Sequence, residues 1–249
     1  MASFFQQLFG SKKPEVTSDL GALGADMHSH LLPGLDDGAE TLEKSLELVE
    51  KMISLGYSKL IMTPHIMGDF YKNTPEGIGE KLALLQEAVA KKGWNIKLEA
   101  AAEYYLDEWF VRRLENNDKL LTFGSNYLLF ETSYINEPHV LKNTVFDMLS
   151  AGYKPVMAHP ERYTYLYGKF DDLIALRESG VLMQVNLNSL GGYYSEGAKR
   201  VAEKLVDAKM VDLVGTDAHS MKHLNYLQKA QSSKYFGKLM ALPLLNSQL

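Results

Sequence analysis

The chain has 249 residues, 46% of them hydrophobic, and a net charge of −5 from 26 Lys and Arg against 31 Asp and Glu. This composition is typical of a globular protein, and the length suits one large α/β domain or two small ones. The absence of cysteine excludes disulfides, iron–sulfur sites and thiol nucleophiles, and leaves His, Asp and Glu as the strong metal ligands. The acidic balance and the lack of a basic run argue against a nucleic-acid surface, so we expect no nucleic-acid partner.

The N-terminal residues 1–24 are predicted to be an extension to one domain that spans residues 25–249. Apolar side chains stand beside two lysines in this extension: Phe4, Phe5, Leu8, Phe9, Lys12 and Lys13. Two interpretations stay open, a frayed or docking segment and a short amphipathic segment for peripheral membrane association. No apolar run reaches the ~20 residues of a transmembrane helix, and no signal-peptide pattern is present. We therefore expect a cytoplasmic protein.

Seven β-rich segments follow in chain order, at residues 25–30, 59–65, 95–105, 126–132, 154–160, 181–186 and 211–219. Helical periodicity appears between them, over Leu42–Ile53, Ile78–Val89 and Val201–Ala208. Helix C-termini that need a positive φ are predicted at Gly56, Gly93, Gly152 and Gly180. Strands that alternate with helices predict a parallel sheet, and seven such units favour a closed or nearly closed barrel over an open doubly wound sheet. No dinucleotide or P-loop motif follows any strand.

Potential metal ligands gather at the C-terminal ends of these predicted strands. In chain order they are His28, His30, His65, Glu103, Glu131, His159, Asp217 and His219, and Asp37 follows in the loop after the first strand. The C-terminal ends of parallel barrel strands meet at one face, so residues that are far apart in sequence become neighbours there. The sequence therefore predicts a metal site at this face.

The local spacing supports the same interpretation. His28 and His30 are two residues apart, as are Asp217 and His219, so each pair points to one face of its strand. Nine nitrogen and oxygen ligands exceed the need of one ion and suit two or three divalent metals, with Glu103 as a candidate bridge. Glu131 is the second candidate bridge, and Asp37 and His219 are expected to lie furthest from the deepest part of the site.

Each of these residues also has a structural interpretation. A single His or Glu at a strand end is commonly a capping or hydrogen-bonding residue, and only the recurrence at successive strand ends favours a metal site. His139, at a predicted helix start, is interpreted as a surface cap. His223 is either a residue of the active-site rim or a structural residue.

At these positions the sequence resembles the polymerase-and-histidinol-phosphatase (PHP) superfamily, and in particular its bacterial capsular-polysaccharide tyrosine phosphatase branch. The most specific block is DMHSHLLPGLDDGAET, from Asp26 to Thr41. The shorter motifs TPH, AAEYY, LLFET, MAHPERY, QVN and GTDAH follow in the order of the family. The resemblance runs from Ala25 to Lys229, which covers most of the chain.

The resemblance implies a distorted (β/α)7 TIM-like barrel with a trinuclear centre held by the same nine residues, within a PHP phosphatase domain at residues 25–249. It implies that Arg162, in HPER, binds phosphate. The related phosphatases usually have a second arginine shortly after the DxH motif, where this chain has Lys222 and His223. Lysine supplies charge without the bidentate geometry of arginine, so the replacement puts this second phosphate contact in doubt.

The implied activity is hydrolysis of phosphotyrosine by a hydroxide that bridges two or three divalent ions, with His219 or His223 assisting the leaving group. Manganese is the expected metal, and iron, zinc, cobalt and magnesium are alternatives. The implied partner is a tyrosine-phosphorylated protein, the tyrosine-rich C-terminal tail of a bacterial kinase that regulates capsular or exopolysaccharide synthesis. Two alternatives stay open: a small-molecule phosphatase of the histidinol-phosphate type, and a non-catalytic PHP scaffold module.

Overall fold

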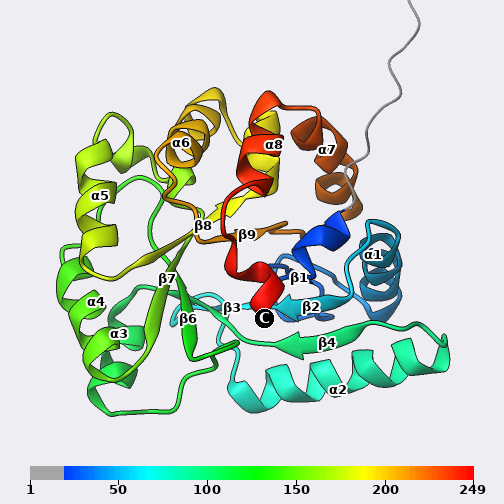
Figure 1. Ribbon diagram of the computed structural model, residues 1–249. Helices are drawn as coiled ribbons and strands as arrows, with labels where there is room; N and C mark the ends of the chain where they lie inside the picture. The colour runs from blue at the N-terminus through cyan, green and yellow to red at the C-terminus, as the bar shows by residue number, and fades with distance from the viewer. Residues whose placement is uncertain (1–19) are drawn as a thin grey trace, which may run out of the picture.

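The structure, a computed structural model, describes residues 20–249. Parallel strands curl around a central axis, and helices cover their outer side (Figure 1). The strands are β1 (Ala25–Asp26), β2 (Lys59–Met62), β3 (His65–Ile66), β4 (Lys97–Ala100), β5 (Glu103–Tyr105), β6 (Tyr127–Glu131), β7 (Lys154–Ala158), β8 (Leu182–Asn186) and β9 (Leu213–Gly215). The α-helices are α1 (Leu42–Ser54), α2 (Pro75–Lys91), α3 (Glu108–Glu115), α4 (Leu141–Ser150), α5 (Phe170–Glu178), α6 (Glu196–Asp207), α7 (Met221–Gln231) and α8 (Lys234–Met240). Short 3₁₀ helices are η1 (Leu20–Leu23), η2 (Pro160–Arg162), η3 (Thr164–Leu166), η4 (Leu187–Gly191) and η5 (Leu245–Gln248).

The strands form two sheets, in the orders β1-β2-β4 and β3-β5-β6-β7-β8-β9. The predicted α/β class and curled parallel sheet are confirmed, but the second and third predicted strands each divide in two. The first division falls at Pro64, which has no N–H to give to a ladder. Backbone hydrogen bonds still cross both divisions, from the Ala101 amide to the Met62 carbonyl at 2.9 Å and from the Glu103 amide to the Pro64 carbonyl at 3.1 Å. These hydrogen bonds therefore join the two sheets around the barrel.

The first and last strand segments meet along a line that we call the seam, between residues 25–30 and 213–219. A parallel bridge joins Ser29 to Ala218, and the His30 amide donates to the Ala218 carbonyl at 2.9 Å. Toward the N-terminal ends of the same two segments, the Asp26 carboxylate accepts from the amide and the hydroxyl of Thr216, at 2.8 and 2.9 Å. Side chains thus supply much of the hydrogen bonding that closes the barrel.

The side chain of Asn246, in η5, completes the seam at the end opposite the predicted site. Its amide nitrogen donates to the carbonyls of Ala25 and Val214, and its oxygen accepts from the Val214 amide at 2.9 Å. Leu245 and Leu249 pack against the apolar interior, which consists of Met27, Ile61, Ala101, Phe123, Leu129, Val156, Ala158 and Leu213. Figure 1 shows the C-terminal segment at the centre of the ring of strands.

The helices pack on the outside of the sheet through a second, larger apolar core. The four predicted glycine C-caps have positive φ values of 97°, 69°, 82° and 100° at Gly56, Gly93, Gly152 and Gly180. Leu20 and Leu23, which belong to the predicted extension, are buried against the barrel.

Within residues 20–249, no helix combines the length and the apolar character that crossing a membrane requires. The Phe-rich segment of the predicted extension, residues 4–13, lies outside the described residues. The prediction of a membrane or partner segment there stays a prediction.

Candidate metal centre

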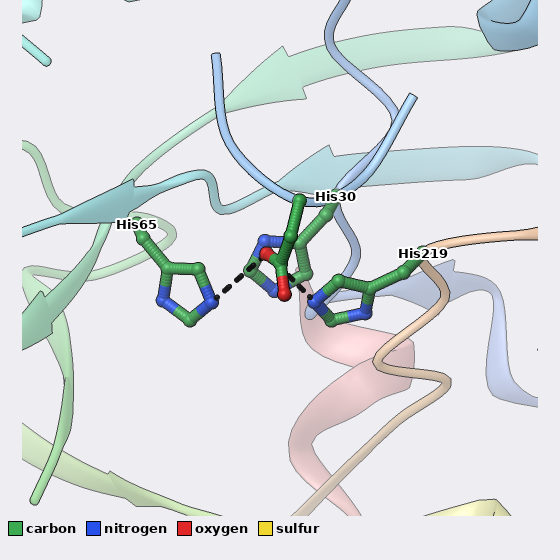
Figure 2. A group of neighbouring side chains, drawn as sticks. His30, His65 and His219 are labelled. Carbon is green, nitrogen blue, oxygen red and sulfur yellow. Dashed lines mark ion pairs between the residues drawn. The ribbon is translucent and has the colours of Figure 1, made fainter. Parts of the chain in front are cut away.

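The structure brings the nine predicted ligand residues together at the C-terminal ends of the strands. The ring centre of His30 lies 4.0 Å from that of His219, 4.5 Å from that of His65 and 5.4 Å from that of His28. Figure 2 shows His30, His65 and His219 converging from three separate segments of the chain. His139, by contrast, is exposed just before α4, as the sequence predicted, but it does not cap the helix, because the N-cap residue is Val140 and no side chain caps this helix.

Glu103, at the start of β5, lies at the middle of the cluster and is fully buried. Its Oε2 atom is 3.2 Å from His28 Nε2, 3.4 Å from His30 Nε2 and 3.2 Å from His65 Nδ1. Its Oε1 atom is 3.0 Å from His159 Nε2. Four imidazoles therefore share one carboxylate, which is the arrangement that a bridging ligand requires.

Three overlapping groups of side chains are compact enough to hold a metal ion. They are His30, Asp37, His65 and His219; His28, His30 and Glu103; and His65, Glu103 and Glu131. The groups share His30, His65 and Glu103. Nitrogen and carboxylate donors in this mixture suit divalent manganese, iron or zinc.

Hydrogen bonds to the outer nitrogens fix how two of the imidazoles face the cluster. His28 Nδ1 lies 2.8 Å from Gln184 Oε1, and His30 Nδ1 lies 2.7 Å from Asp36 Oδ2. An imidazole that donates from Nδ1 presents its Nε2 to a metal, and such outer partners are usual for ligating histidines. The two Nε2 atoms face each other at 3.3 Å. A proton on one of these two atoms, or a metal ion bound by both, offsets the repulsion of their lone pairs, and the donor set fits a metal.

The electrostatics of the cluster also favour cations. Burial lowers the pKa of His28, but the charges of Glu103 and Asp217 outweigh it and raise this pKa to about 9. Although burial opposes ionisation, the neighbouring histidines hold the pKa of both carboxyls well below the usual range. The buried carboxylates therefore stay ionised and attract positive charge, which a proton or a metal ion supplies.

Asp217, after β9, divides its two oxygens between the cluster and its surroundings. Oδ2 accepts from Arg162 Nη1 at 2.7 Å, from Asn186 Nδ2 at 2.7 Å and from the Tyr194 hydroxyl at 3.1 Å. Oδ1 faces the cluster and lies 3.5 Å from the Nε2 atoms of His28 and His30. Because Oδ2 is fully engaged, Oδ1 is the oxygen available to a metal.

Arg162 lies at the edge of the cluster, between two aromatic rings. Its guanidinium carbon is 4.7 Å from the ring centre of Tyr134 and 4.2 Å from that of Tyr194. The side chain is 21% exposed and lines a cleft of about 800 Å³ above the cluster. A charged, aromatic-stacked guanidinium beside a group of metal-type ligands is suited to bind an anion such as a phosphoryl group.

Two of the candidate ligands have an unusual backbone conformation. His159 has a φ of 33° and Asp217 a φ of 49°, and both values lie in the left-handed region that non-glycine residues rarely adopt. Such strain is concentrated at functional sites, where the surrounding structure holds it in place. Here it turns both side chains into the cluster at the ends of β7 and β9.

The outermost predicted residues lie around the mouth of the cleft. Asp37 Oδ1 is 3.4 Å from His219 Nε2 and 3.6 Å from His65 Nε2, and the Asp37 side chain is 56% exposed. These two ion pairs are the dashed lines of Figure 2. His219 is 16% exposed, so these two residues are less deeply placed than Glu103, as expected.

The two residues at the position of the missing arginine differ in their surroundings. His223 lines the cleft, where burial and the charge of His219 lower its pKa to about 4. Its imidazole is therefore neutral at neutral pH, which differs from the protonated form expected of an acid that assists the leaving group. Lys222 is exposed, with Nζ 5.7 Å from the ring centre of Tyr193.

Sequence reasoning missed the residues that position the candidate ligands. Asp36 also accepts from the His65 amide at 3.0 Å, so it orients two segments of the site. Its position beside Asp37 in the LDDG segment was the available signal. The QVN motif contains Gln184 and Asn186, but no pattern in the sequence indicated that they contact His28 and Asp217.

Comparison with known proteins gives a family match and named relatives. The family model for capsular polysaccharide synthesis proteins, CpsB/CapC, matches residues 24–240. The chain is 29% identical over 201 residues to the tyrosine-protein phosphatase YwqE of Bacillus subtilis, covering 81% of this chain and 79% of the relative. It is 24% identical over 211 residues to the tyrosine-protein phosphatase CpsB of Streptococcus pneumoniae, covering 82% and 87%.

Solved structures show the same relationship. A structure from a study of YwqE from Bacillus subtilis and CpsB from Streptococcus pneumoniae, described as metal-dependent tyrosine phosphatases, superposes with a TM-score of 0.80 at 28% identity. It covers 90% of this chain and 91% of the other. An amidohydrolase from Mycoplasma synoviae, at 12% identity and a TM-score of 0.52, shares the fold alone. The sequence match over residues 24–240 shows that the chain belongs to the CpsB/CapC family of capsular polysaccharide synthesis proteins.

Proposed function

We propose that this protein is a metal-dependent tyrosine phosphatase that hydrolyses phosphotyrosine in a protein substrate. The observation that carries the proposal is the position of the buried Glu103 carboxylate among four imidazoles, next to an arginine that lines an open cleft. The named activity of the relatives YwqE and CpsB supports it.

The nine residues would act together as the ligands of two or three divalent ions. They are His28, His30, Asp37, His65, Glu103, Glu131, His159, Asp217 and His219. Bound ions would supply a water of lowered pKa as the nucleophile and positive charge for the phosphoryl oxygens. We propose manganese, because histidine and carboxylate donors without thiolate suit it, with iron, zinc, cobalt and magnesium as alternatives.

The other polar residues of the cleft would bind and orient the substrate. Arg162 donates to Asp217 through Nη1, which leaves its remaining N–H groups for the phosphoryl oxygens. The stacking of Tyr134 and Tyr194 on the guanidinium holds it at the edge of the cluster. His223, neutral at neutral pH, would orient a water or the leaving oxygen by a hydrogen bond, and Lys222 would add charge at the rim.

The open mouth of the cleft favours a protein substrate over a metabolite. Asp37 at the mouth is 56% exposed, and Ile135, which also lines the cleft, is 71% exposed. A histidinol-phosphate type of phosphatase would be expected to enclose its small substrate. Given the capsular polysaccharide family, we propose the tyrosine-rich tail of a bacterial kinase in the cytoplasm as the substrate.

The test compares hydrolysis of a phosphotyrosine peptide, a phosphoserine peptide and histidinol phosphate by the purified protein, with its metal content measured by mass spectrometry. We expect preference for the phosphotyrosine peptide, loss of activity after EDTA, recovery with Mn²⁺ and no effect of iodoacetamide. Activity that survives exhaustive chelation would overturn the metal-dependent mechanism. Preference for histidinol phosphate would favour the small-molecule alternative, and hydrolysis of none of the three after Mn²⁺ loading would favour the scaffold alternative.

A further inference from the structure

The two sides of the cleft differ in chemistry. One side carries the polar groups Arg162, Asp217, His219 and His223. The other side carries apolar and aromatic groups from the ends of three strands: Met67 after β3, Tyr105 at the end of β5, and Tyr134 and Ile135 after β6. Because β3, β5 and β6 are neighbours in the sheet, these four residues follow one another along one rim of the cleft, which we call the apolar wall.

Ile135 is the most exposed part of this wall, at 71%. Its backbone is nevertheless held on both sides. Ser133 Oγ accepts from the amides of Ile135 and Asn136, both at 3.3 Å. The carbonyl of Tyr134 accepts from the amide and the hydroxyl of Thr164, at 2.7 and 2.8 Å. An isoleucine that an anchored loop holds in water, at the mouth of a polar cleft, is placed to contact a ligand.

Tyr134, the residue before Ile135, connects it to Arg162, the group suited to bind a phosphoryl anion. The ring of Tyr134 stacks on Arg162 at 4.7 Å, and the next residue, Ile135, lies at the mouth. A phosphotyrosine whose phosphoryl group reaches Arg162 would place the residues next to it in the substrate at this mouth. Small aryl phosphates have nothing in that position.

We propose that Ile135 is a specificity residue that binds an apolar side chain next to the phosphotyrosine of the substrate. This inference rests on the proposed tyrosine phosphatase function and names the kind of peptide that it takes. The charges at the mouth support the preference, because Glu40 lines the cleft and the exposed Glu137 follows Ile135 by two residues. An acidic residue flanking the phosphotyrosine would meet negative charge there, whereas leucine would cover Ile135.

The experiment measures kcat/KM for a phosphotyrosine peptide with leucine on both sides, for the same peptide with aspartate in those positions, and for phenyl phosphate. The variants are Ile135→Ala and Ile135→Asp. Phe146→Ala is the matched control, because Phe146 is a similarly exposed apolar residue, at 69%, on α4 outside the cleft. Thermal unfolding followed by circular dichroism checks that each variant is folded.

We expect wild type to prefer the leucine peptide over the aspartate peptide. Both Ile135 variants should lower the ratio of kcat/KM for the leucine peptide to that for phenyl phosphate by about 5- to 10-fold, since the contact buries one or two methylene groups. Phe146→Ala should leave this ratio unchanged.

Equal ratios in wild type and both Ile135 variants would overturn the inference while leaving the tyrosine phosphatase function intact. Failure of the wild type, with its metals bound, to hydrolyse either phosphotyrosine peptide would overturn the proposed function and the inference together. The two failures are therefore distinguishable in one set of assays.

Discussion

The two ends of the barrel solve the problem of buried polar groups in opposite ways. At the end formed by η5, the side-chain amide of Asn246 is 1% exposed and uses its hydrogen-bonding atoms on Ala25 and Val214. At the other end, buried carboxylates and imidazoles face one another, and the Nε2 atoms of His28 and His30 approach to 3.3 Å.

The difference shows which end serves stability and which serves binding. Buried polar groups that hydrogen-bond to each other contribute to stability. Each hydrogen bond that they lose to water on folding is replaced by one within the protein. Imidazoles that are gathered around a few buried carboxylates can exchange their protons for metal ions, so this cluster is suited to bind a further ligand. Substitutions at the two ends should therefore affect different measurements.

We call the end of the barrel that holds the buried carboxylates and imidazoles the charged end. The largest effect of a substitution is expected at its centre. Glu103→Gln keeps the shape of the side chain but removes the negative charge that four imidazoles share. We expect kcat/KM for a phosphotyrosine peptide to fall about 10³-fold, more than the ~10- to 100-fold that outer partners of metal ligands typically cost. Glu99→Gln, on β4 outside the site, is the control. Retention of more than a tenth of the activity would contradict the central role of Glu103.

At the other end, Asn246→Ala should mainly reduce stability. The substitution removes three hydrogen bonds and leaves the buried Val214 amide without its acceptor. We expect the free energy of unfolding to fall by about 3 kcal/mol in urea titrations, while activity per folded molecule is kept. Asn143→Ala, at an exposed position of α4, should change little. A loss of activity without a loss of stability would erase the proposed division between the two ends.

Asp36→Asn tests the residues that hydrogen-bond to the outer nitrogens of the candidate ligands. The variant has a single acceptor oxygen, so it cannot accept from both the Gly38 amide, which bonds Oδ1, and the His65 amide, which bonds Oδ2, and it no longer supplies the charge that orients His30. We expect metal affinity to weaken about 10- to 100-fold, measured by competition with a chelator. Asp69→Asn, an exposed aspartate in the loop after β3, provides the comparison. Unchanged affinity would show that Asp36 serves only to hold its loop.

The smallest effect is expected at Glu161, a buried carboxyl beneath the charged end. Burial raises its pKa from 4.5 to about 7, against the hydrogen bonds from Ser189 and the Asn186 amide. Below pH 4.5 the group is protonated in both the folded and the unfolded chain. As pH rises from 4.5 to 7 the unfolded chain ionises first, so stability falls, and above pH 7 the loss is complete.

Glu161→Gln removes this titration. Relative to wild type, the variant should gain about 1 to 2 kcal/mol of stability between pH 5 and pH 7.5, measured by thermal unfolding at each pH. Glu178→Gln, exposed at the end of α5, should show no such dependence. A difference between Glu161→Gln and wild type that stays constant with pH would contradict the raised pKa.

The sequence allowed prediction of the charged end better than of the other end. The pairs His28 with His30 and Asp217 with His219 are separated by two residues, which predicted that each pair points to one side. The structure places both pairs just after β1 and β9, and the left-handed φ of Asp217 helps to turn its side chain into the cluster. The choice between Asp36 and Asp37 depends on the conformation of one loop, which no periodicity encodes. Asn246 contacts residues 32 and 221 positions away, and no repeating pattern marks such a contact.

Each of the seven predicted strand segments contains an observed strand, in the predicted chain order, but two of the segments are divided, which gives nine strands over residues 20–249. The division of the second strand depends on Pro64, which was visible in the sequence. The third strand divides at Ala101 and Ala102, and alanine does not itself require such a break. The division depends instead on the separate pairing of β4 with β2 and of β5 with β3. The roles of the nine candidate ligands stay predictions until metal analysis is done.

The seam also has a consequence for how the protein folds. Asp26 and Thr216 are 190 residues apart, and Asn246 and Ala25 are 221 apart, so closing the seam joins very distant parts of the chain. Contacts of this kind form slowly, because a long loop must be ordered first. His28 and His30 lie on one side of the seam, and Asp217 and His219 on the other. The candidate ligands from the two ends of the chain therefore come together only when the seam closes, so the proposed metal site is complete only in the closed barrel.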